Sequence, residues 1–180
     1  MKRLATAAGS LGLSVLLAGS AGAQAAPAGL RADLLAQLDD AATKLVRLAE
    51  AIPAEKYTWR PAEGVRSVSQ VLVHVAGGNF LFPTMVGVEP GARPPRDAEQ
   101  TVTDKAQVVD WLKRSFEHAR SAIRGVSDAA LDQSVDMFGR QTSGRNVLLT
   151  MVSHAHEHLG QLIAYARTTG VTPPWSVAGN

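Results

Sequence analysis

Residues 143–169 have the sequence SGRNVLLTMVSHAHEHLGQLIAYARTT and are followed by Gly170. Apolar residues recur every three or four positions through this stretch, which predicts a long helix that ends at the glycine. His154 and His158 lie one turn apart, so their side chains share a face, whereas His156 is rotated by roughly 200° from His154. The stretch therefore predicts a helix that presents two histidines together on one side.

Three further segments carry apolar residues at helical spacing. The first covers about residues 30–52. The second begins at Ser67, where Gln70 three positions later completes a capping box, and its apolar stripe extends to Met85. The third begins near Asp104 and has one polar and one apolar side. Together with the C-terminal stretch, these segments predict four helices.

The connections between these segments are rich in residues that interrupt helices. Residues 87–95 contain several glycines and prolines and are long enough to leave the topology open, and a further short turn opens at Ser127. No convincing strand pattern occurs. A chain of 180 residues with 46% hydrophobic and 19% charged residues suits one compact domain. We therefore predict an all-α fold, a four-helix bundle over residues 26–180.

The N-terminal residues predict a cleavable signal peptide, residues 1–25. Lys2 and Arg3 precede an apolar run that ends in small residues. The run is too short to span a bilayer, so we expect cleavage after Ala23 or Ala25 and no stable membrane insertion. The alternative is an uncleaved anchor or an N-terminal helix of the fold. Cleavage would give an exported protein, periplasmic or secreted.

Charge and cysteine content exclude several classes of function. Removing Lys2 and Arg3 from the 18 basic residues leaves as many as the 16 acidic ones. The mature domain is therefore formally neutral, and nothing argues for a nucleic-acid partner. Cysteine is absent, which excludes disulfides, thiolate nucleophiles, zinc fingers and iron–sulfur clusters. Any metal ion must be held by nitrogen and oxygen atoms.

His74 supplies a candidate third ligand from the second helix. It lies in an otherwise apolar stretch, where an unpaired imidazole would be costly to bury. Two histidines one turn apart are a weak signal alone, but with His74 the pair His154 and His158 would complete a three-histidine site with open positions for a divalent ion. Gly77 and Gly78 would leave space beside the metal or simply permit close helix packing.

The remaining histidines are not predicted to be ligands. His118 has Arg114 and Arg120 on neighbouring turns, so we expect it at the solvated surface. His156 is expected at the surface or behind the ligands. The zinc-peptidase motif HExxH is not met, because Gly160 occupies the place of its second histidine. A zinc peptidase is therefore disfavoured.

Three blocks of sequence carry a resemblance to a known family. The blocks are residues 59–61 (Trp-Arg-Pro) with 67–74, residues 154–162 with two histidines before a Gly-Gln pair, and residues 138–139 with 170 and 173–175. In these blocks the chain resembles the DinB family, also described as YfiT-like metalloenzymes, which are small four-helix bundle proteins. The likeness covers nearly all of the mature chain.

The resemblance implies a divalent metal ion, commonly zinc or nickel, bound by His74, His154 and His158 in the bundle core. One departure is Leu159, where the family usually has arginine between the last histidine and the glycine. The family's characterised branches include thiol-dependent transferases and isomerases. The resemblance therefore favours an enzyme that acts on a small molecule.

Two residues near the histidine pair are catalytic candidates. Gln161, one turn beyond His158, would hydrogen-bond a substrate or metal-bound water, and Glu157 would act as a base or as a group behind the metal ligands. Ordinary helix packing is the alternative for both residues.

The leading hypothesis is an exported, divalent-metal-dependent enzyme, a hydrolase or a group transferase with a small-molecule substrate. The alternative is a non-catalytic metal- or ligand-binding helical bundle. A third class is a haem-binding bundle in which Met85, Met137 or Met151 would be an axial ligand. A homodimer is compatible with each of these.

Overall fold

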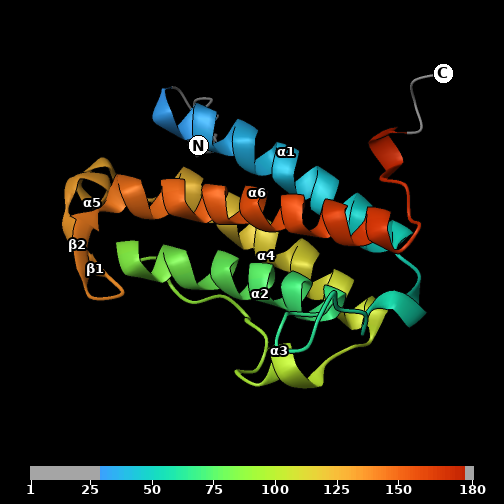
Figure 1. Ribbon diagram of the computed structural model, residues 1–180. Helices are drawn as coiled ribbons and strands as arrows, with labels where there is room; N and C mark the ends of the chain where they lie inside the picture. Colours follow the sequence, from blue (N-terminus) through green and yellow to red (C-terminus); the bar gives the residue numbers. More distant parts are fainter. Residues whose placement is uncertain (1–28, 177–180) are drawn as a thin grey trace, which may run out of the picture.

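Four long helices lie side by side in the computed structural model, which describes residues 29–176 (Figure 1). They are α1 (Leu30–Ala51), α2 (Val68–Leu81), α4 (Lys105–Gly125) and α6 (Gly144–Thr168). This arrangement confirms the prediction of a mostly helical bundle. The predicted signal peptide lies outside the described residues. Within residues 29–176, none of the helices combines the length and the apolar character that a membrane crossing needs.

The helix ends lie where the capping signals predict them. Ser67 accepts a hydrogen bond from the backbone of Gln70, whose side chain in turn accepts from the Ser67 backbone at 2.8 Å, so the predicted capping box of α2 is confirmed. Asp104 caps α4 and Ser143 caps α6, each with its side-chain oxygen accepting a hydrogen bond from a backbone N–H of the first turn. Gly170, with positive φ, lies just after the end of α6.

The second helix is shorter than its apolar stripe predicts. α2 ends at Leu81, and the 3-10 helix η2 (Phe82–Val86) continues the chain to just beyond Met85. Pro83 lacks a backbone N–H, so it cannot donate the hydrogen bond that an α-helix needs at this position. The chain therefore tightens into 3-10 geometry there.

Several short elements complete the fold. They are η1 (Ala54–Lys56), α3 (Ala98–Thr101), α5 (Asp128–Asp132) and η3 (Pro174–Ser176). The turn that the sequence predicts at Ser127 is α5, which Ser127 caps. By contrast, α3 lies in the connection between η2 and α4, where no helix is predicted. It packs against α2.

A two-stranded antiparallel hairpin lies before α6, where the sequence shows no strand pattern. Strand β1 (Ser134–Met137) pairs with β2 (Arg140–Ser143). The turn between them has positive φ at both Phe138 (57°) and Gly139 (82°), as in the tight turns that suit hairpins. No residue of either strand is fully buried, so the strands lack the apolar alternation that would predict them.

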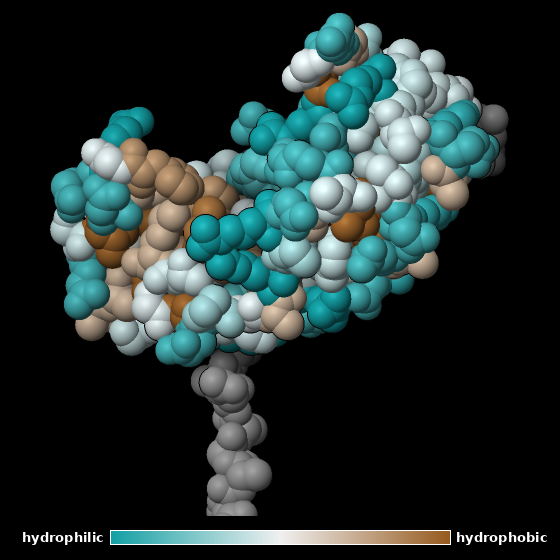
Figure 2. All heavy atoms as spheres, turned by 90° about the horizontal axis from the view of Figure 1, so that it is seen from below, coloured by the Kyte–Doolittle hydropathy of each residue, from teal (hydrophilic) through white to brown (hydrophobic). Residues whose placement is uncertain are grey.

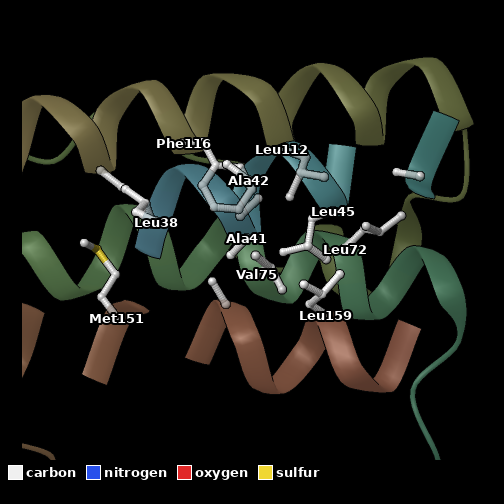
Figure 3. Packing of buried hydrophobic residues seen from close by; sticks show 14 of the residues in the cluster. Leu38, Ala41, Ala42, Leu45, Leu72, Val75, Leu112, Phe116, Met151 and Leu159 are labelled. Atoms are coloured by element: carbon white, nitrogen blue, oxygen red, sulfur yellow. The ribbon is translucent and has the colours of Figure 1, made fainter. Parts of the chain in front are cut away.

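The hydrophobic core lies between the four long helices (Figure 3). α1 packs against α4 and α6, and α2 also packs against α4 and α6. The largest core side chains come from all four helices and include Leu38, Leu45, Leu72, Leu112, Phe116, Met151 and Leu162. Truncating one buried leucine in such a core costs about 2–5 kcal/mol of stability. The core thereby fixes α2 and α6 as neighbours.

Candidate metal centre

The three histidines that the sequence predicts as ligands lie together between α2 and α6. One ring nitrogen from each of His74, His154 and His158 lies within 4.8 Å of the other two. The ring centroids are 4.9 Å apart between His74 and each of the others, and 4.5 Å apart within the α6 pair. The fold thus brings together a set of nitrogen donors that could hold a metal ion.

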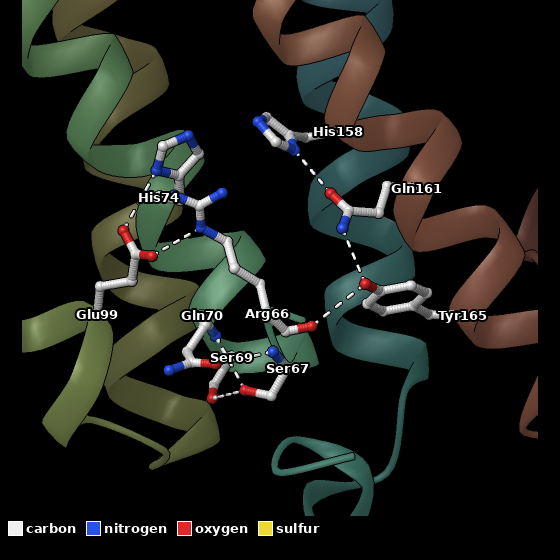
Figure 4. Close-up of polar contacts among 9 residues, drawn as sticks. All are labelled: Arg66, Ser67, Ser69, Gln70, His74, Glu99, His158, Gln161 and Tyr165. Carbon is white, nitrogen blue, oxygen red and sulfur yellow. Dashed lines mark hydrogen bonds and ion pairs between the residues drawn. The ribbon is translucent and has the colours of Figure 1, made fainter. Parts of the chain in front are cut away.

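Two of the rings are oriented by hydrogen bonds at Nδ1 (Figure 4). The Nδ1–H of His74 donates to the carboxylate of Glu99 at 3.2 Å, and the Nδ1–H of His158 donates to the side-chain oxygen of Gln161 at 2.8 Å. With the proton on Nδ1, the Nε2 atom of each ring keeps its lone pair for a cation. Such contacts behind metal-binding histidines fix both the tautomer and the ring orientation.

His154 is held by close packing instead. A Cβ atom at Gly78 would lie only 2.8 Å from Cε1 of the His154 ring, whereas one at Gly77 would meet nothing within 4 Å. Of the two glycines, Gly78 is therefore the one that makes room for the ring. The Nδ1 atom of His154 is buried without a hydrogen-bond partner among the described residues.

The missing partner of His154 is consistent with a metal ion. A buried polar atom left without a partner costs about 1–3 kcal/mol. Coordination of a divalent cation would give an imidazole nitrogen that partner, and zinc and nickel both accept nitrogen donors of this kind. The donor set and the packing therefore fit a metal ion.

Burial favours the neutral, metal-binding form of two of the rings, His74 and His154. Burial, and after it the nearby His158 and His74, lowers the pKa of His154 to about 4. Burial is also the main cause that lowers the pKa of His74, with Arg66 adding to the effect and Glu99 opposing it. Both imidazoles are therefore neutral at pH 7, and only the neutral ring coordinates a metal.

Gln161 lies within a chain of hydrogen bonds. Its amide nitrogen donates to the hydroxyl of Tyr165 at 2.8 Å, and that hydroxyl donates to the backbone carbonyl of Arg66 at 3.2 Å. Trp59 packs edge-on against the Tyr165 ring, with 5.2 Å between centroids. Gln161 thus orients His158, and its contact with a substrate stays a prediction.

Glu99 and Arg66 are site residues that the sequence does not reveal. Glu99 lies on α3 and accepts a second hydrogen bond, from Nε of Arg66, at 2.7 Å. Arg66 immediately precedes the capping residue of α2. No motif or helical period connects the two positions, so only the path of the connection before α4 shows that they meet.

Glu157 and His156 lie outside the cluster. Glu157 is exposed and makes no hydrogen bond or ion pair within residues 29–176, so its catalytic role stays a prediction. Nε2 of His156 lies 3.1 Å from the backbone carbonyl of Gln37 on α1. This position, away from the α2 side of α6, agrees with the predicted rotation of His156 from His154.

The prediction that His118 is a solvated surface residue is wrong. The side chain is partly buried, its ring centroid lies 5.1 Å from that of Phe80, and its Nε2 atom has no hydrogen-bond partner within the described chain. The reason is the connection after η2, which folds across the ring so closely that a Cβ atom at Gly91 would lie 2.8 Å from Nδ1.

An open pocket of about 530 Å³ lies beside the histidine cluster. Its lining residues are Arg60, Gly64, Val65, Arg66, Gln70, Glu99 and Gln161. Glu99 and Gln161 thus connect the pocket to His74 and His158 by the hydrogen bonds described above. The volume is in the range of sites that bind small molecules.

Comparison with known proteins identifies the family that this sequence matches. Residues 37–162 match the family model described as the DinB superfamily. The uncharacterized protein YjoA of Bacillus subtilis (strain 168) is 30% identical over 130 residues, which cover 69% of this chain and 81% of that protein.

The fold is similar to those of solved structures. A DinB-like protein from Bacillus cereus ATCC 10987 superposes with a TM-score of 0.68 at 19% identity, covering 78% of this chain and 93% of that one. YfiT from Bacillus subtilis, a probable metal-dependent hydrolase with an unusual four-helix bundle topology, superposes with a TM-score of 0.61 at 17% identity, covering 79% and 89%. At these identities the structures establish likeness of fold alone.

Proposed function

The chain belongs to the DinB superfamily, and from this we propose that it is a metal-dependent enzyme whose single divalent ion is bound by His74, His154 and His158. The observation that carries the proposal is the convergence of three imidazoles, two of them oriented through Nδ1. The reaction we propose is hydrolysis or group transfer on a small molecule. The description of YfiT as a probable metal-dependent hydrolase supports the first of these.

The residues around the ligands have separate tasks. A divalent ion held by His74, His154 and His158 would act as a Lewis acid toward a substrate bond, and zinc or nickel would suit three imidazole donors. Glu99 and Gln161 keep the proton of their histidines on Nδ1. Arg66 balances the charge of Glu99, and the pocket beside the cluster gives a small substrate room.

Metal analysis tests the ligand set. Purified protein should contain one divalent ion per chain, and substitution of His74, His154 or His158 by alanine should remove it. His156→Ala is the matched control, because this histidine lies on the same helix but outside the cluster. Retention of the metal by His154→Ala together with its loss from His156→Ala would contradict the proposal.

Activity against a panel of esters, phosphates and thiol adducts tests the enzymatic part. Turnover should stop when a chelator removes the metal, return when the metal is restored, and be absent from His74→Ala. Protein that binds the metal but turns over none of these classes would favour the non-catalytic alternative, a bundle that holds a metal or a ligand.

We also propose that the protein is exported, periplasmic or secreted, after its signal peptide is cleaved behind Ala23 or Ala25. The basic residues and the short apolar run at the N-terminus support this. Mass spectrometry of exported protein should show a chain that begins at Gln24 or Ala26. An intact Met1 would contradict the proposal.

A further inference from the structure

The surface over α2 and α6 differs chemically on the two sides of the histidine cluster. On one side is the pocket that Arg60 and Arg66 help to line. On the other side Phe82 packs edge-on against His154, with 5.6 Å between centroids, and Phe138 packs edge-on against Phe82 at 6.1 Å. In Figure 2 hydrophobic residues gather toward the end that carries the hairpin, whereas the other half is a mixture of hydrophilic and neutral residues with few hydrophobic ones.

The pocket side has positive charge that no partner neutralises. Nε of Arg66 binds Glu99, but the terminal nitrogens of this guanidinium make no hydrogen bond within residues 29–176. Arg60 makes no ion pair or hydrogen bond in that part of the chain either. Two arginines and one glutamate leave the lining with one net positive charge. Guanidinium groups bind carboxylates through paired hydrogen bonds, so a singly charged carboxylate would balance this lining.

The opposite side exposes an aromatic ring to solvent. Phe138 is 66% exposed, the largest exposed fraction among the described large hydrophobic residues. It also has a φ of 57°, which is uncommon for a bulky residue. A ring held in this conformation beside Phe82, one aromatic contact away from His154, offers a binding surface for an apolar group.

We infer that this surface binds a small amphipathic carboxylate, with the carboxylate at Arg60 and Arg66, the apolar end at the exposed Phe138 ring, which lies against the buried Phe82, and the reacting bond at the histidines between them. The inference rests on the proposed function, because the metal site defines where the bond reacts, and it adds the chemical class of the substrate. The contacts follow one another along the surface from the arginines through the histidines to the aromatic rings, and this order sets the orientation of the bound carboxylate.

Binding of matched probes tests the inference without any turnover. Calorimetry would compare 6-phenylhexanoate with its uncharged amide, with hexanoate and with inorganic phosphate, in metal-free and metal-loaded protein. The phenyl acid should bind about tenfold more tightly than the amide or hexanoate in both forms, because the arginines and the rings are present without metal. Equal affinity for the acid and the amide, or tighter binding of phosphate, would overturn the inference.

Single substitutions then test which residues bind the carboxylate end and the phenyl end of the probe. Arg60→Gln should remove the preference for acid over amide, and Phe138→Asn should remove the preference for phenylhexanoate over hexanoate, since asparagine tolerates positive φ. Arg124→Gln and Leu149→Gln are the controls, because both residues are exposed elsewhere on the bundle. Loss of preference in the controls, or its retention in the two test variants, counts against the assignment.

Metal content measured on the same samples distinguishes a failure of the proposed metal site from a failure of the proposed substrate class. A protein that holds its metal through the three histidines but binds the acid and the amide alike would refute the substrate class and leave the metal site intact. Histidine variants that keep their metal would refute the metal site, while the probe preferences of metal-free protein would still report on the surface itself.

Discussion

Histidine side chains are partly or fully buried in two regions of the molecule, but the two regions differ in what surrounds the ring. Between α2 and α6 three imidazoles converge, and two of them have an acceptor at Nδ1. At His118 a single ring packs against Phe80 under the connection after η2. Burial is the leading cause of a lowered pKa both at His118 and in the cluster. Burial is therefore common to both regions, and the convergence of several nitrogen donors is what makes the cluster the candidate metal site.

The largest expected difference between the two regions is in metal-induced stabilisation. A thousandfold excess of free metal over its dissociation constant should stabilise the wild type by about 4 kcal/mol, which raises Tm by about 8–16 °C for a domain of this size. His118→Ala should show the same rise from a lower starting Tm, and His158→Ala should show none. Differential scanning fluorimetry with and without metal measures this. Loss of the rise in His118→Ala would make that region part of the metal site.

Neighbouring glycines give a second test, of the packing around His154. Gly78→Ala places a methyl group against the His154 ring, so we expect metal affinity to fall by about 10- to 100-fold, as for other losses of ligand orientation. Gly77→Ala meets no neighbour and should leave the affinity unchanged while stabilising α2 by about 0.5–1 kcal/mol. Competition with a chelating dye measures the affinities. Equal affinities for the two variants would show that Gly78 is only a packing residue.

A smaller effect is expected where a residue acts on a ligand through one hydrogen bond. Glu99→Gln keeps the shape of the side chain but weakens the acceptor for His74, so metal affinity should fall by about tenfold. Glu63→Gln is the matched control, since Glu63 is exposed and has no ion pair within residues 29–176. The same dye competition applies. An unchanged affinity in Glu99→Gln would limit its role to the pairing with Arg66.

The sequence predicts the parts of this site that a helical period determines. His154 and His158 share a face of α6 because they are one turn apart, and His74 meets them because α2 is packed beside α6. Glu99 could not be predicted, because it reaches His74 through a connection whose path follows no period. The misplacement of His118 has the same origin, since its burial depends on Gly91 crossing the ring. The spacing of residues in the sequence therefore predicts which side chains share a helix face, but it does not predict the path of a loop.

The hairpin shows a similar limit. Tight turns with two positive φ angles favour Asn-Gly or Asp-Gly, and here Phe138 precedes Gly139. A phenylalanine in that place gives no turn signal, and short strands outside the core give no alternation. Phe138, the residue that removes the usual turn signal of the hairpin, is also the residue that exposes an aromatic ring beside the site.

The smallest effect we predict is a pH dependence that separates the two regions. The folded-state pKa of His118 lies below the unfolded value of about 6.5, so the unfolded chain takes up the proton first as the pH falls. The contribution of the neutral ring to stability is therefore complete above about pH 6.5 and is lost progressively below it. His118→Gln, which cannot titrate, should reduce the loss of unfolding free energy between pH 7 and pH 5, and metal should not change that reduction.

His154→Gln should also reduce this loss of unfolding free energy in metal-free protein, because burial lowers the pKa of the His154 ring to about 4 in the folded wild type. Metal should no longer stabilise this variant at either pH. Urea unfolding at both pH values, with and without metal, measures these differences. If metal altered the His118→Gln effect, the two regions would be coupled and His118 would belong to the site after all.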